Sequence, residues 1–583
     1  MDEEDEVDPG VTAPANSVCL PFKLQDEDSG SQAVVPQEPG AMEDIFDFEA
    51  LEAACCAQRE PGCSPSAEAG LQGSAVRSRK PRPSSAPAAE RSEGLRVAIL
   101  ANGSRGDVQP FVALALRLSR MRHRVRIMTN ADLVDFCVGH GVDAVPVFVS
   151  WSIVIEQIGG MSGSSADVKC ARCMRRGKAA AEEWLKMNPL ACRAAEDCLE
   201  EFQPQAVICG LQSTGPALRL ELGTGVPSIY TFFARDQLEI GVAFTQAEPA
   251  RPSFFASSPV YEPVDTTDFS KDLHQTGAWI LADEPTSADI AEGGRLHRLK
   301  AFLASGPRPL AMGWGSMIAE GLPPVAMLSL ALRTLRDSGR RGVILGGWAK
   351  LHTLGEQLIA DGYLPGLCRG TDFRESFEEC AALAEYAESN VCFIEEAPHG
   401  WLLPQCSCFV HHGGAGTTHA ALAAGIPSVI TPIFGDQFAN AETLEALDAG
   451  AAFELPLQEL SSSQLAQAVQ VAEASAMQAD ACGRRLRAED GVRIAAAVID
   501  RFLRAEVQSG RWADQLRHAK IAEEANHRRS SAGNRSGPGV TAAGPPVSPL
   551  RCAAGSPLRE RTPPPMLTRV RISGRRAVVR GAM

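Results

Sequence analysis

Short apolar runs alternate with amphipathic segments along the central part of the chain. Leu95–Ala101 is a largely apolar run with the length of a buried strand, and Gln109–Met121 then repeats its apolar residues at helical spacing. Two more strand-like runs follow at Arg124–Asn130 and Asp143–Val149. This alternation predicts βαβ units, in which helices cover both faces of a parallel sheet.

The same alternation continues, stops and then resumes. A strand is predicted at Gln205–Gly210, a helix at about Thr214–Leu222 and a strand at Val226–Ala234. Glu248–Asp272, in contrast, is rich in Pro, Ser and Asp and shows no clear period. Two blocks separated by a break predict an α/β protein with two Rossmann-like doubly wound domains facing a cleft. The strands predicted in the second block are Pro309–Met317, Gly342–Trp348, Val391–Ala397, Cys408–His412, Pro427–Ile433 and Ala451–Leu455.

This pattern divides the chain into six predicted parts. The two ends lack sustained periodicity, so both are predicted to be disordered. An amphipathic helix is expected at about Arg493–Glu506, after the second domain. The predicted boundaries are 1–94 for an acidic, Pro- and Ser-rich tail, 95–290 for the first domain, 291–308 for a linker, 309–480 for the second domain, 481–519 for C-terminal helices and 520–583 for a basic tail.

Composition narrows the classes of function. The chain of 583 residues is 45% hydrophobic, which suits a globular protein of two or three domains. Its net charge of −15 argues against a nucleic-acid binder, because binding a polyanion needs a basic surface. No apolar run approaches the roughly 20 residues that cross a bilayer, so any membrane contact is expected to be peripheral.

The cysteines favour a reducing compartment. The 17 cysteines are scattered, and no basic and apolar signal segment opens the chain, so we expect a cytoplasmic protein, with or without peripheral membrane contact. Cys170 and Cys173 form a lone CxxC, which we interpret as ordinary thiols because a zinc site needs further ligands. The basic string Arg77–Arg82 is interpreted as a solvated linker, with a localisation or phosphoinositide patch as the alternative.

The richest chemical signal is the segment CFVHHGGAGTTHAALAAGIPSVITPIFGDQ, Cys408–Gln437. A short apolar strand runs into a glycine turn, Gly413–Gly416, and Thr417 and Thr418 are predicted to open a helix that ends at Gly425. Such a turn points backbone N–H groups and the positive end of the helix dipole at one place. That place favours an anion, above all a phosphate.

The following strand ends in a pair of candidates for binding hydroxyl groups. Asp436 and Gln437 come after Pro427–Ile433, which puts a carboxylate and an amide at the C-terminal edge of a strand, where the ligands of open α/β sheets lie. Phosphate donors beside such a pair predict a sugar nucleotide. By strand alternation, one of His411 and His412 faces the core and the other the cleft.

A second candidate site follows the first strand, in Asn102–Pro110 (NGSRGDVQP). A dinucleotide-binding turn reads GxGxxG and has an acid at the end of the next strand. Here the glycines are three apart and the next strand ends in Thr129 and Asn130, so NAD binding is not expected. Asp107 is either the N-cap of the helix, worth about 1 kcal/mol, or a base at the cleft edge, and the two roles are compatible.

These two segments resemble those of the UDP-glycosyltransferases with the two-Rossmann GT-B fold, in particular the sterol 3-beta-glucosyltransferases. The resemblance covers about Leu95–Leu503 and is weaker between Trp151 and Lys300. NGSRGDVQP is similar to the G-S/T-R-G-D-V-Q-P signature of sterol and antibiotic-modifying enzymes. One departure is that Phe438-Ala439-Asn440 follows the Asp-Gln pair, where the sterol enzymes usually carry an aromatic residue, often Trp.

The resemblance implies roles for the matching positions. The HHGGAGTT turn holds the donor diphosphate, the Asp-Gln pair binds the hexose hydroxyls, and Asp107 is the general base. The implied catalytic residues are Asp107 and His412, with His411 as a core residue. The implied donor-binding residues are Ser316, Trp348, Trp401, His412, Gly414, Gly416, Thr417, Thr418, Asp436 and Gln437, and the acceptor-side loop is Gly103, Ser104, Arg105 and Gly106.

Several of these positions carry an alternative interpretation. Ser316 lies in GWGSM, which is similar to the family's GFGSM turn at the donor phosphate or nucleoside. The APHGW string resembles the PHDWL segment that lines the uracil pocket, with Gly400 in place of the acid. Trp348 and Trp401 either stack on the donor or pack in the core. Arg105 either contacts a ligand or pins the turn.

Further segments are interpreted by comparison with that family. Ala349–Asn390 is a longer connection than usual, and Phe373–Ser389 within it predicts an added surface helix. Its predicted apolar face consists of Phe377, Ala381, Leu383 and Ala384. The acceptor wall is expected at Ser150–Met174, and the last amphipathic helix is expected to cross back onto the first domain.

The predicted function is transfer of glucose from UDP-glucose to a sterol or other lipid hydroxyl with inversion at the sugar carbon. A carboxylate is needed as base, and the start of a helix stabilises the charge that the leaving UDP gains. No Asp-x-Asp metal site is seen, so neither a metal nor another cofactor is expected. Two alternatives remain: transfer to a small phenolic or polyketide acceptor, and a catalytically silent lipid-binding protein of the same fold.

Overall fold

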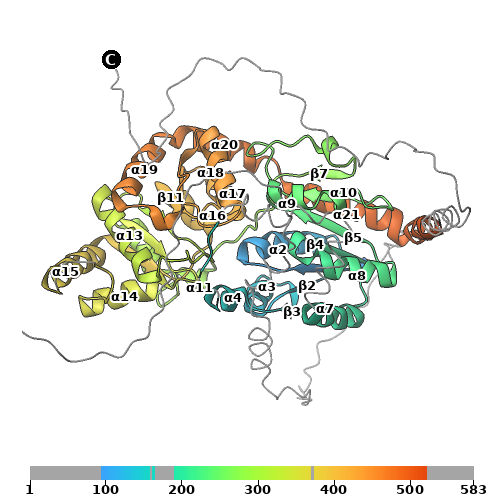
Figure 1. The fold of residues 1–583 in the computed structure, drawn as a ribbon, viewed down its shortest axis with the longest axis horizontal. Helices are drawn as coiled ribbons and strands as arrows, with labels where there is room; N and C mark the ends of the chain where they lie inside the picture. The colour runs from blue at the N-terminus through green and yellow to red at the C-terminus, as the bar shows by residue number, and fades with distance from the viewer. Residues whose placement is uncertain (1–93, 158–159, 164–188, 369–372, 522–583) are drawn as a thin grey trace, which may run out of the picture. The chain divides into compact units, whose positions relative to one another are not determined.

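The first domain is built on a sheet of seven parallel strands. The computed structural model describes residues 94–157, 160–163, 189–368 and 373–521, coloured from blue to red in Figure 1. The strands of this sheet lie in the order β3-β2-β1-β4-β5-β6-β7, and neighbouring strands are parallel. They are β1 (Arg96–Ala101), β2 (Arg124–Asn130), β3 (Asp143–Phe148), β4 (Ala206–Gly210), β5 (Ser228–Phe232), β6 (Ser253–Phe255) and β7 (Leu273–Gln275).

The second domain is built on a sheet of six parallel strands. Their order is β10-β9-β8-β11-β12-β13. In both sheets the chain starts at a central strand, builds outward and crosses back, which is the Rossmann-like arrangement that the alternating pattern predicted. The strands are β8 (Leu310–Met312), β9 (Gly342–Leu345), β10 (Val391–Ile394), β11 (Cys408–His411), β12 (Ser428–Ile430) and β13 (Gly450–Ala452).

Helices cover both faces of each sheet, and the sequence of the strands shows why. In β1, Val97 and Ile99 belong to one apolar core cluster, whereas Ala98 and Leu100 belong to another. Successive side chains of a strand point to opposite faces, so a continuous apolar run gives a strand buried on both sides. The strands predicted from such runs are thereby confirmed as members of two parallel sheets.

The helices occur in chain order around these sheets. Those of the first block are α2 (Arg105–Arg120), α3 (Val134–Gly139), α4 (Trp151–Gln157), α7 (Pro189–Phe202), α8 (Thr214–Thr224), α9 (Arg235–Ile240), α10 (Val242–Thr245), α11 (Ser287–Ile290) and α12 (His297–Ala304). Those of the second are α13 (Pro324–Ser338), α14 (Leu351–Asp361), α15 (Phe373–Asn390), α16 (His399–Leu402), α17 (Ala415–Ala424), α18 (Gln437–Ala446), α19 (Ser462–Ala474), α20 (Ala476–Arg487) and α21 (Gly491–Phe502).

Short turns of other helix types complete the described residues. Five are 3₁₀ turns: η1 (Ala131–Leu133), η2 (Leu211–Ser213), η3 (Thr266–Asp268), η4 (Leu403–Gln405) and η5 (Leu457–Glu459). The segment η6 (Leu503–Gln508) continues α21 as a π-helix. None of the helices in the described ranges has both the length and the apolar character needed to cross a membrane.

Two helices begin earlier than the sequence pattern predicted. α2 starts at Arg105 rather than at Gln109, because Ser104 caps it, and Asp107 therefore lies inside the first turn instead of preceding the helix. α17 starts at Ala415 rather than at Thr417, with Gly414 at its N-cap. In both cases the turn residues that interrupt the apolar period already belong to the helix. The predicted end of α17 at Gly425, in a left-handed conformation, is confirmed.

The segment predicted to lack regular structure contains a strand. β6 lies inside Glu248–Asp272, and β7 follows directly. Phe254 and Phe255 are fully buried, in the two core clusters on opposite faces of the sheet. A strand of three residues is too short to show the period-two pattern, which explains why the sequence alone missed it.

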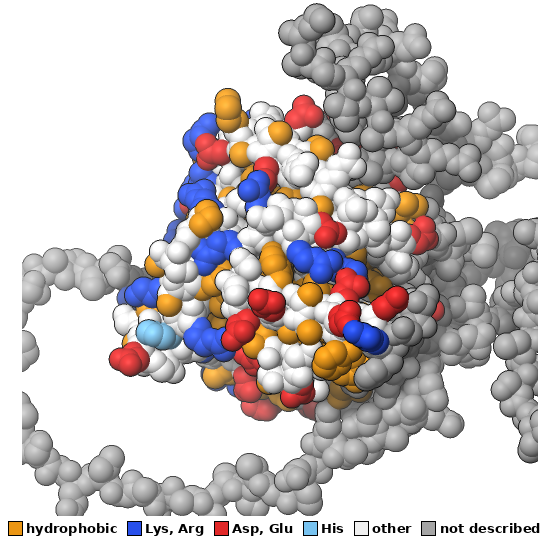
Figure 2. All heavy atoms as spheres, turned by 90° about the vertical axis from the view of Figure 1, so that its left-hand side faces the viewer, with side chains coloured by type: hydrophobic (Ala, Val, Ile, Leu, Met, Phe, Trp, Pro, Cys, Tyr) orange, Lys and Arg blue, Asp and Glu red, His pale blue; other side chains and the backbone are white. Residues whose placement is uncertain are grey.

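The added helix α15 is present, but its buried face differs from the predicted one. Phe377 is 46% exposed and Ala381 is exposed, whereas Cys380, Ala387 and the predicted Leu383 and Ala384 are buried against the second core. The predicted apolar face of α15 is therefore displaced by about one residue from the face that is buried in the structure. The outer surface of this part of the molecule mixes acidic, basic and apolar side chains (Figure 2).

The C-terminal helices pack on the first domain. Ala496, Ile499 and Phe502 of α21 share a core cluster with Phe111 of α2. Residues 511–521 are helical, and Trp512 donates a hydrogen bond to the carbonyl of Gly225 at 2.7 Å. The six boundaries proposed from the sequence stay predictions. Apart from residues 94, 520 and 521, both tails lie outside the described residues, as do the CxxC motif and the basic string.

A buried ion pair stabilises this C-terminal packing. The side chains of Arg251 and Glu221 are 3% and 7% exposed and are bonded to each other. The guanidinium also lies over the ring of Trp512, 4.8 Å from its centroid, while Glu221 accepts the N–H of Ser228 at 3.0 Å.

Replacing the arginine should therefore destabilise the whole protein. Arg251→Ala leaves Glu221 as a buried charge without its partner, so we expect a loss of about 3 kcal/mol in the free energy of unfolding, measured by denaturant titration. Arg484→Ala removes the exposed ion pair with Asp480 and should cost less than about 0.5 kcal/mol. Equal losses in the two variants would contradict the structural role of the buried pair.

Candidate functional site

The turn between β1 and α2 positions Asp107 at the edge of the first sheet. Ser104 donates to the Asp107 carboxylate from its backbone N–H at 2.8 Å and from its hydroxyl at 3.1 Å. Burial raises the pKa of Asp107 above its usual value, while these two hydrogen bonds oppose the rise. A carboxylate that is partly shielded from water but remains accessible suits proton abstraction.

Glycine is required where this turn leaves the strand. Gly103 has a φ of +138°, and a Cβ at this position would lie 2.4 Å from a carboxylate oxygen of Asp107. Its N–H donates to Asn130 Oδ1 at 2.9 Å, and the Asn130 amide donates to Asn102 Oδ1 at 2.9 Å. Sequence reasoning did not assign a role to Asn130. Its position at the end of the neighbouring strand was the available signal.

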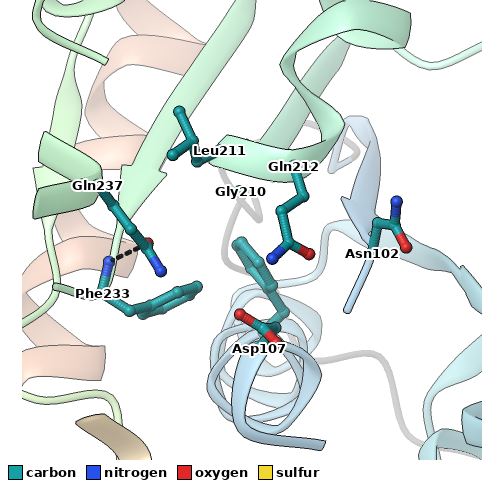
Figure 3. A pocket seen from close by; sticks show the side chains of 8 residues that line it. Asn102, Asp107, Gly210, Leu211, Gln212, Phe233 and Gln237 are labelled. Atoms are coloured by element: carbon teal, nitrogen blue, oxygen red, sulfur yellow. Dashed lines mark hydrogen bonds between the residues drawn. The ribbon is translucent and has the colours of Figure 1, made fainter. Parts of the chain in front are cut away.

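Asp107 faces a small polar space (Figure 3). The space has a volume of about 10 Å³, enough for about one water molecule. Gln212, in η2 after β4, and Gln237, in α9 after β5, reach it, and neither was predicted. Gln237 accepts the N–H of Phe233 at 3.0 Å. It is lined by Asn102, Asp107, Phe111, Gly210, Leu211, Gln212, Phe233 and Gln237.

Arg105 is held by ionic contacts rather than directed at an open site. Its guanidinium pairs with Glu396, lies 3.7 Å from Asp283 and stacks over the ring of Phe136 at 4.6 Å. It also donates to Gln109 at 3.2 Å. These contacts favour the structural alternative, in which Arg105 pins the turn. Of the other acceptor-side loop positions, Ser104 caps α2 and Gly106 is exposed.

The glycine turn of the second domain leads into an uncapped helix. No side chain caps the start of α17 at Gly414, Gly416 is exposed and Thr417 is partly exposed. Thr418, in contrast, is buried and donates its hydroxyl to the carbonyl of Gly414 at 3.0 Å. The backbone N–H groups of the first turn are thus available to an anion, while Thr418 holds the turn in shape.

Close packing explains the two glycines before this helix. Gly413 has a φ of +90°, and a Cβ there would lie 2.5 Å from the side chain of Ile430. A Cβ on Gly414 would lie 2.5 Å from Nε2 of His412. A side chain at position 414 would therefore displace His412, and one at position 413 would displace Ile430 of β12.

The two histidines differ as strand alternation predicted. His411 is fully buried, and its Nδ1 accepts the N–H of Gly413 at 3.0 Å, which requires an unprotonated Nδ1. His412 is 7% exposed and lies beside Gly315 and Gly414. Burial lowers the pKa of His412 to about 4, so its ring is neutral at pH 7. Nδ1 of His412 is buried and has no hydrogen-bond partner among the described residues.

Asp436 and Gln437 lie at the start of α18, after β12. Gln437 is buried, and its side-chain oxygen accepts the N–H groups of Ile433 and Phe434 at 2.8 and 3.0 Å. Its oxygen therefore shapes the loop that leads into α18. Asp436 accepts a hydrogen bond from Asn440 at 3.0 Å and remains partly exposed.

The remaining donor candidates surround the same turn. Trp348 donates its backbone N–H to Gly315 at 2.9 Å, which joins the GGW and GWGSM turns, and Ser316 beside it is partly exposed. Trp314 is the core residue of GWGSM, because its indole donates to Thr431 at 2.9 Å in the interior. Trp401 packs against the apolar cluster around Leu402.

The starts of α2 and α17 meet. A Cβ on Gly416 would lie only 3.6 Å from the carbonyl oxygen of Gly106. Burial raises the pKa of Asp436 to about 8, and the nearby carboxylates of Asp236 and Asp107 add to this rise. Asp236, in the first turn of α9 after β5, was not predicted. An acid at the start of the helix that follows a buried strand was the signal for it.

This arrangement brings together a site for an anion, groups for binding hydroxyls and a candidate base. In the described ranges, no three His, Cys, Asp or Glu side chains gather as a metal site. The absence of a metal in the reaction remains a prediction. Of the predicted acceptor wall, only Ser150–Gln157 and residues 160–163 are described.

Two family models match one segment each of the two sheet domains. Residues 97–218 match the glycosyltransferase family 28 N-terminal domain. Residues 379–497 match the C-terminal domain of erythromycin biosynthesis protein CIII-like proteins. The two matches cover the turn that carries Asp107 and the turn that carries the uncapped helix.

Relatives extend across most of the chain. The sterol 3-beta-glucosyltransferase UGT80B1 of Arabidopsis thaliana is 27% identical over 70% of this chain and 68% of its own length. A sterol 3-beta-glucosyltransferase of Aspergillus terreus is 26% identical over 71% of this chain, which spans only 30% of that longer protein. Among solved structures, the spinosyn rhamnosyltransferase SpnG has 15% identity and a TM-score of 0.47, covering 70% of this chain and 100% of its own.

These matches confirm the resemblance that the two turns indicated. Each sheet domain carries one family match: an N-terminal domain model lies in the first sheet domain and a C-terminal domain model in the second. The chain has two Rossmann-like domains, and over about 70% of its length it is similar to the sterol 3-beta-glucosyltransferases.

Proposed function

We propose that the protein transfers glucose from UDP-glucose to a hydroxyl of a sterol or another lipid, with inversion at the sugar carbon. The observation that carries the proposal is the meeting of the starts of α2 and α17 at Gly106 and Gly416. This contact brings a base on one helix and an anion-binding turn on the other within reach of one substrate pair. The names of the relatives supply the sterol and the glucose.

The donor diphosphate would bind at the start of α17. The N–H groups of the first turn, together with the positive end of the helix dipole, attract its charge. A neutral His412 can donate its N–H to a diphosphate oxygen, and its unpartnered Nδ1 is consistent with a role toward a ligand. Ser316 and Trp348, in neighbouring turns, would contact the nucleotide.

The hexose would bind between Asp436 and Gln437. A sugar hydroxyl both donates and accepts hydrogen bonds, so a carboxylate beside an amide N–H₂ satisfies both capacities. Binding of hydroxyl donors would also stabilise the ionised form of Asp436, which burial and nearby acids disfavour in the free protein.

In the reaction, Asp107 would accept the proton of the acceptor hydroxyl while its oxygen attacks the anomeric carbon. The bond between that carbon and the diphosphate oxygen breaks, and both electrons leave with UDP. The start of α17 stabilises the charge that UDP gains, which is stronger in the transition state than in the bound donor. We further propose that this chemistry needs no metal and that the protein acts in the cytosol or on the surface of membranes.

The direct test is product formation with a defined donor. The purified chain is titrated with UDP-glucose in a calorimeter and then incubated with UDP-glucose and a panel of sterols, other lipids and phenolic compounds. We expect donor binding and, by mass spectrometry, a hexosylated sterol, with the same rate in EDTA. Product from phenolic compounds alone would favour the alternative acceptor class. Donor binding without any transfer would indicate a silent protein.

Loss of the proposed base gives a second prediction. Asp107→Asn keeps the shape and the hydrogen bonds from Ser104 but cannot accept the proton, so kcat should fall by about 10²–10⁴-fold. The dissociation constant for UDP should stay unchanged. Asp135→Asn, on the exposed face of α3, is the matched control. A variant with more than a tenth of the wild-type kcat would exclude Asp107 as the base.

Asp436 gives a third prediction, on stability. A carboxyl with a pKa of about 8 when folded and about 4 when unfolded favours unfolding as the pH rises from about 4 to about 8, since the unfolded chain ionises first. Asp436→Asn removes this penalty, so at pH 8 its melting temperature should exceed that of the wild type by roughly 2–4 °C, a difference of about 1 kcal/mol. At pH 4 the difference should vanish.

The same variant should bind UDP-glucose more weakly, because an amide cannot replace both acceptor oxygens. Asp361→Asn, at the exposed end of α14, should match the wild type in melting temperature at both pH values. A lower melting temperature of Asp436→Asn at pH 8 would show that the carboxylate is stabilised rather than disfavoured in the free protein.

A further inference from the structure

A loop of the first domain reaches into the core of the second. Tyr261, in the loop after β6, is 3% exposed and lies in the same apolar cluster as Leu422, Ile430 and Ala441. These three residues belong to α17, β12 and α18, the elements that carry the proposed donor site. One side chain of the first domain thus packs behind the donor-binding surface of the second.

The hydroxyl of Tyr261 fixes the orientation of a buried amide. Its oxygen lies 3.0 Å from both the backbone oxygen and the side-chain oxygen of Asn440, which is 6% exposed. The amide N–H₂ of Asn440 donates to the carbonyl of Gly413 at 2.9 Å and to Asp436 at 3.0 Å. Since the Gly413 carbonyl only accepts, the amide nitrogen has to face it, and the amide oxygen therefore faces the Tyr261 hydroxyl, whose proton can go to this oxygen or to the backbone oxygen of Asn440.

We propose that Tyr261 and Asn440 are positioning residues that hold the Asp436 carboxylate and the Gly413 turn in the geometry that binds the donor sugar. This inference rests on the proposed function, because it assigns Asp436 to the hexose. It adds that the sugar site of the second domain is completed by a residue of the first. Asn440, which departs from the aromatic residue usual in the sterol enzymes, then acts through Asp436.

The geometry explains how the pair acts on the sugar and not on the nucleotide. Asn440 binds one oxygen of the Asp436 carboxylate, so the group cannot rotate and its other oxygen is left for a hydroxyl. The hydrogen bond from Asn440 also favours the charged form of Asp436, against burial and the nearby acids. Both of these effects act at Asp436, whereas the contact of Asn440 with the Gly413 carbonyl lies just before the start of α17, where the diphosphate would bind, and does not involve the Tyr261 hydroxyl.

The same loop also braces α17. Ser258 donates its N–H to Nε2 of His419 at 3.2 Å, and Nδ1 of His419 lies 2.7 Å from the carbonyl of Ala415. The rings of Tyr261 and His419 meet edge to face at 5.0 Å. Substitution of the Tyr261 hydroxyl alone leaves these contacts and the ring packing in place, which separates its effect on α18 from that on α17.

The test compares two ligands that differ only in the sugar. Dissociation constants for UDP and UDP-glucose are measured by calorimetry for the wild type and for Tyr261→Phe. We expect UDP-glucose to bind about tenfold more weakly to the variant, as for loss of one hydrogen bond in a charged network, and UDP within about twofold of the wild type. Tyr386→Phe removes a hydroxyl that donates to Arg340 far from this pair and should change neither constant.

A second variant shows whether the two residues act as one unit. Asn440→Ala should weaken the binding of UDP-glucose at least as much as Tyr261→Phe does, and the double variant should lose no more than Asn440→Ala alone, because the tyrosine acts through the amide. Additive losses would overturn the proposal, as would an equal loss for both ligands in Tyr261→Phe. Binding of neither ligand to the wild type would instead reject the proposed function itself.

Discussion

The arrangement depends on a helix start left without a side-chain cap. α17 begins at Ala415, with Gly414 as its N-cap, shortly after the end of β11. The turn that leads into it requires glycine at position 413, because Gly413 has a positive φ and a side chain there would meet Ile430. His411 stabilises this turn, because its Nδ1 accepts a hydrogen bond from the N–H of Gly413. A capping serine or aspartate would satisfy the same N–H groups and stabilise the helix, but it would occupy the place of the anion.

In the free protein, burial disfavours the charged forms of two side chains close to this helix start. Burial disfavours protonation of His412 and ionisation of Asp436, and two further carboxylates lie near the latter. A phosphate bound at the start of α17 would supply hydrogen-bond partners to the N–H groups there, and a sugar would supply them to Asp436. Each ligand would thus pair a group that water solvates poorly in the free protein. The surrounding strands and helices therefore hold the site in shape, rather than contacts among the ligand-binding groups themselves. This is expected where a bound ligand supplies the hydrogen-bond partners that these groups lack.

The sequence predicted the parts of this site that are local and missed those that are not. Both glycine turns, the order of strands and helices, and the neighbourhood of Asp436 and Gln437 follow from contiguous residues. The capping of α2 by Ser104 was missed because the turn residues interrupt the apolar period that marks a helix. The contact between Tyr261 and Asn440 joins positions 179 residues apart, and no local pattern records such a pair. The register of α15 failed because alanines on both sides of the helix give a weak apolar period.

This division between local and distant residues bears on how the two substrates are selected. The groups that would bind the donor lie mostly in one stretch of sequence, from Cys408 to Asn440. Replacement or deletion of this stretch would therefore remove them together. The groups around Asp107 come from four separate segments, the ends of β1, β2, β4 and β5. Exchange of one loop there changes the surface met by an acceptor and leaves the base and the donor turn untouched. A loop of the same domain that also braces α17 and α18, however, cannot vary as freely. Acceptor specificity is therefore expected to reside in the loops after β3, β4 and β5 and not in the segment at 257–261.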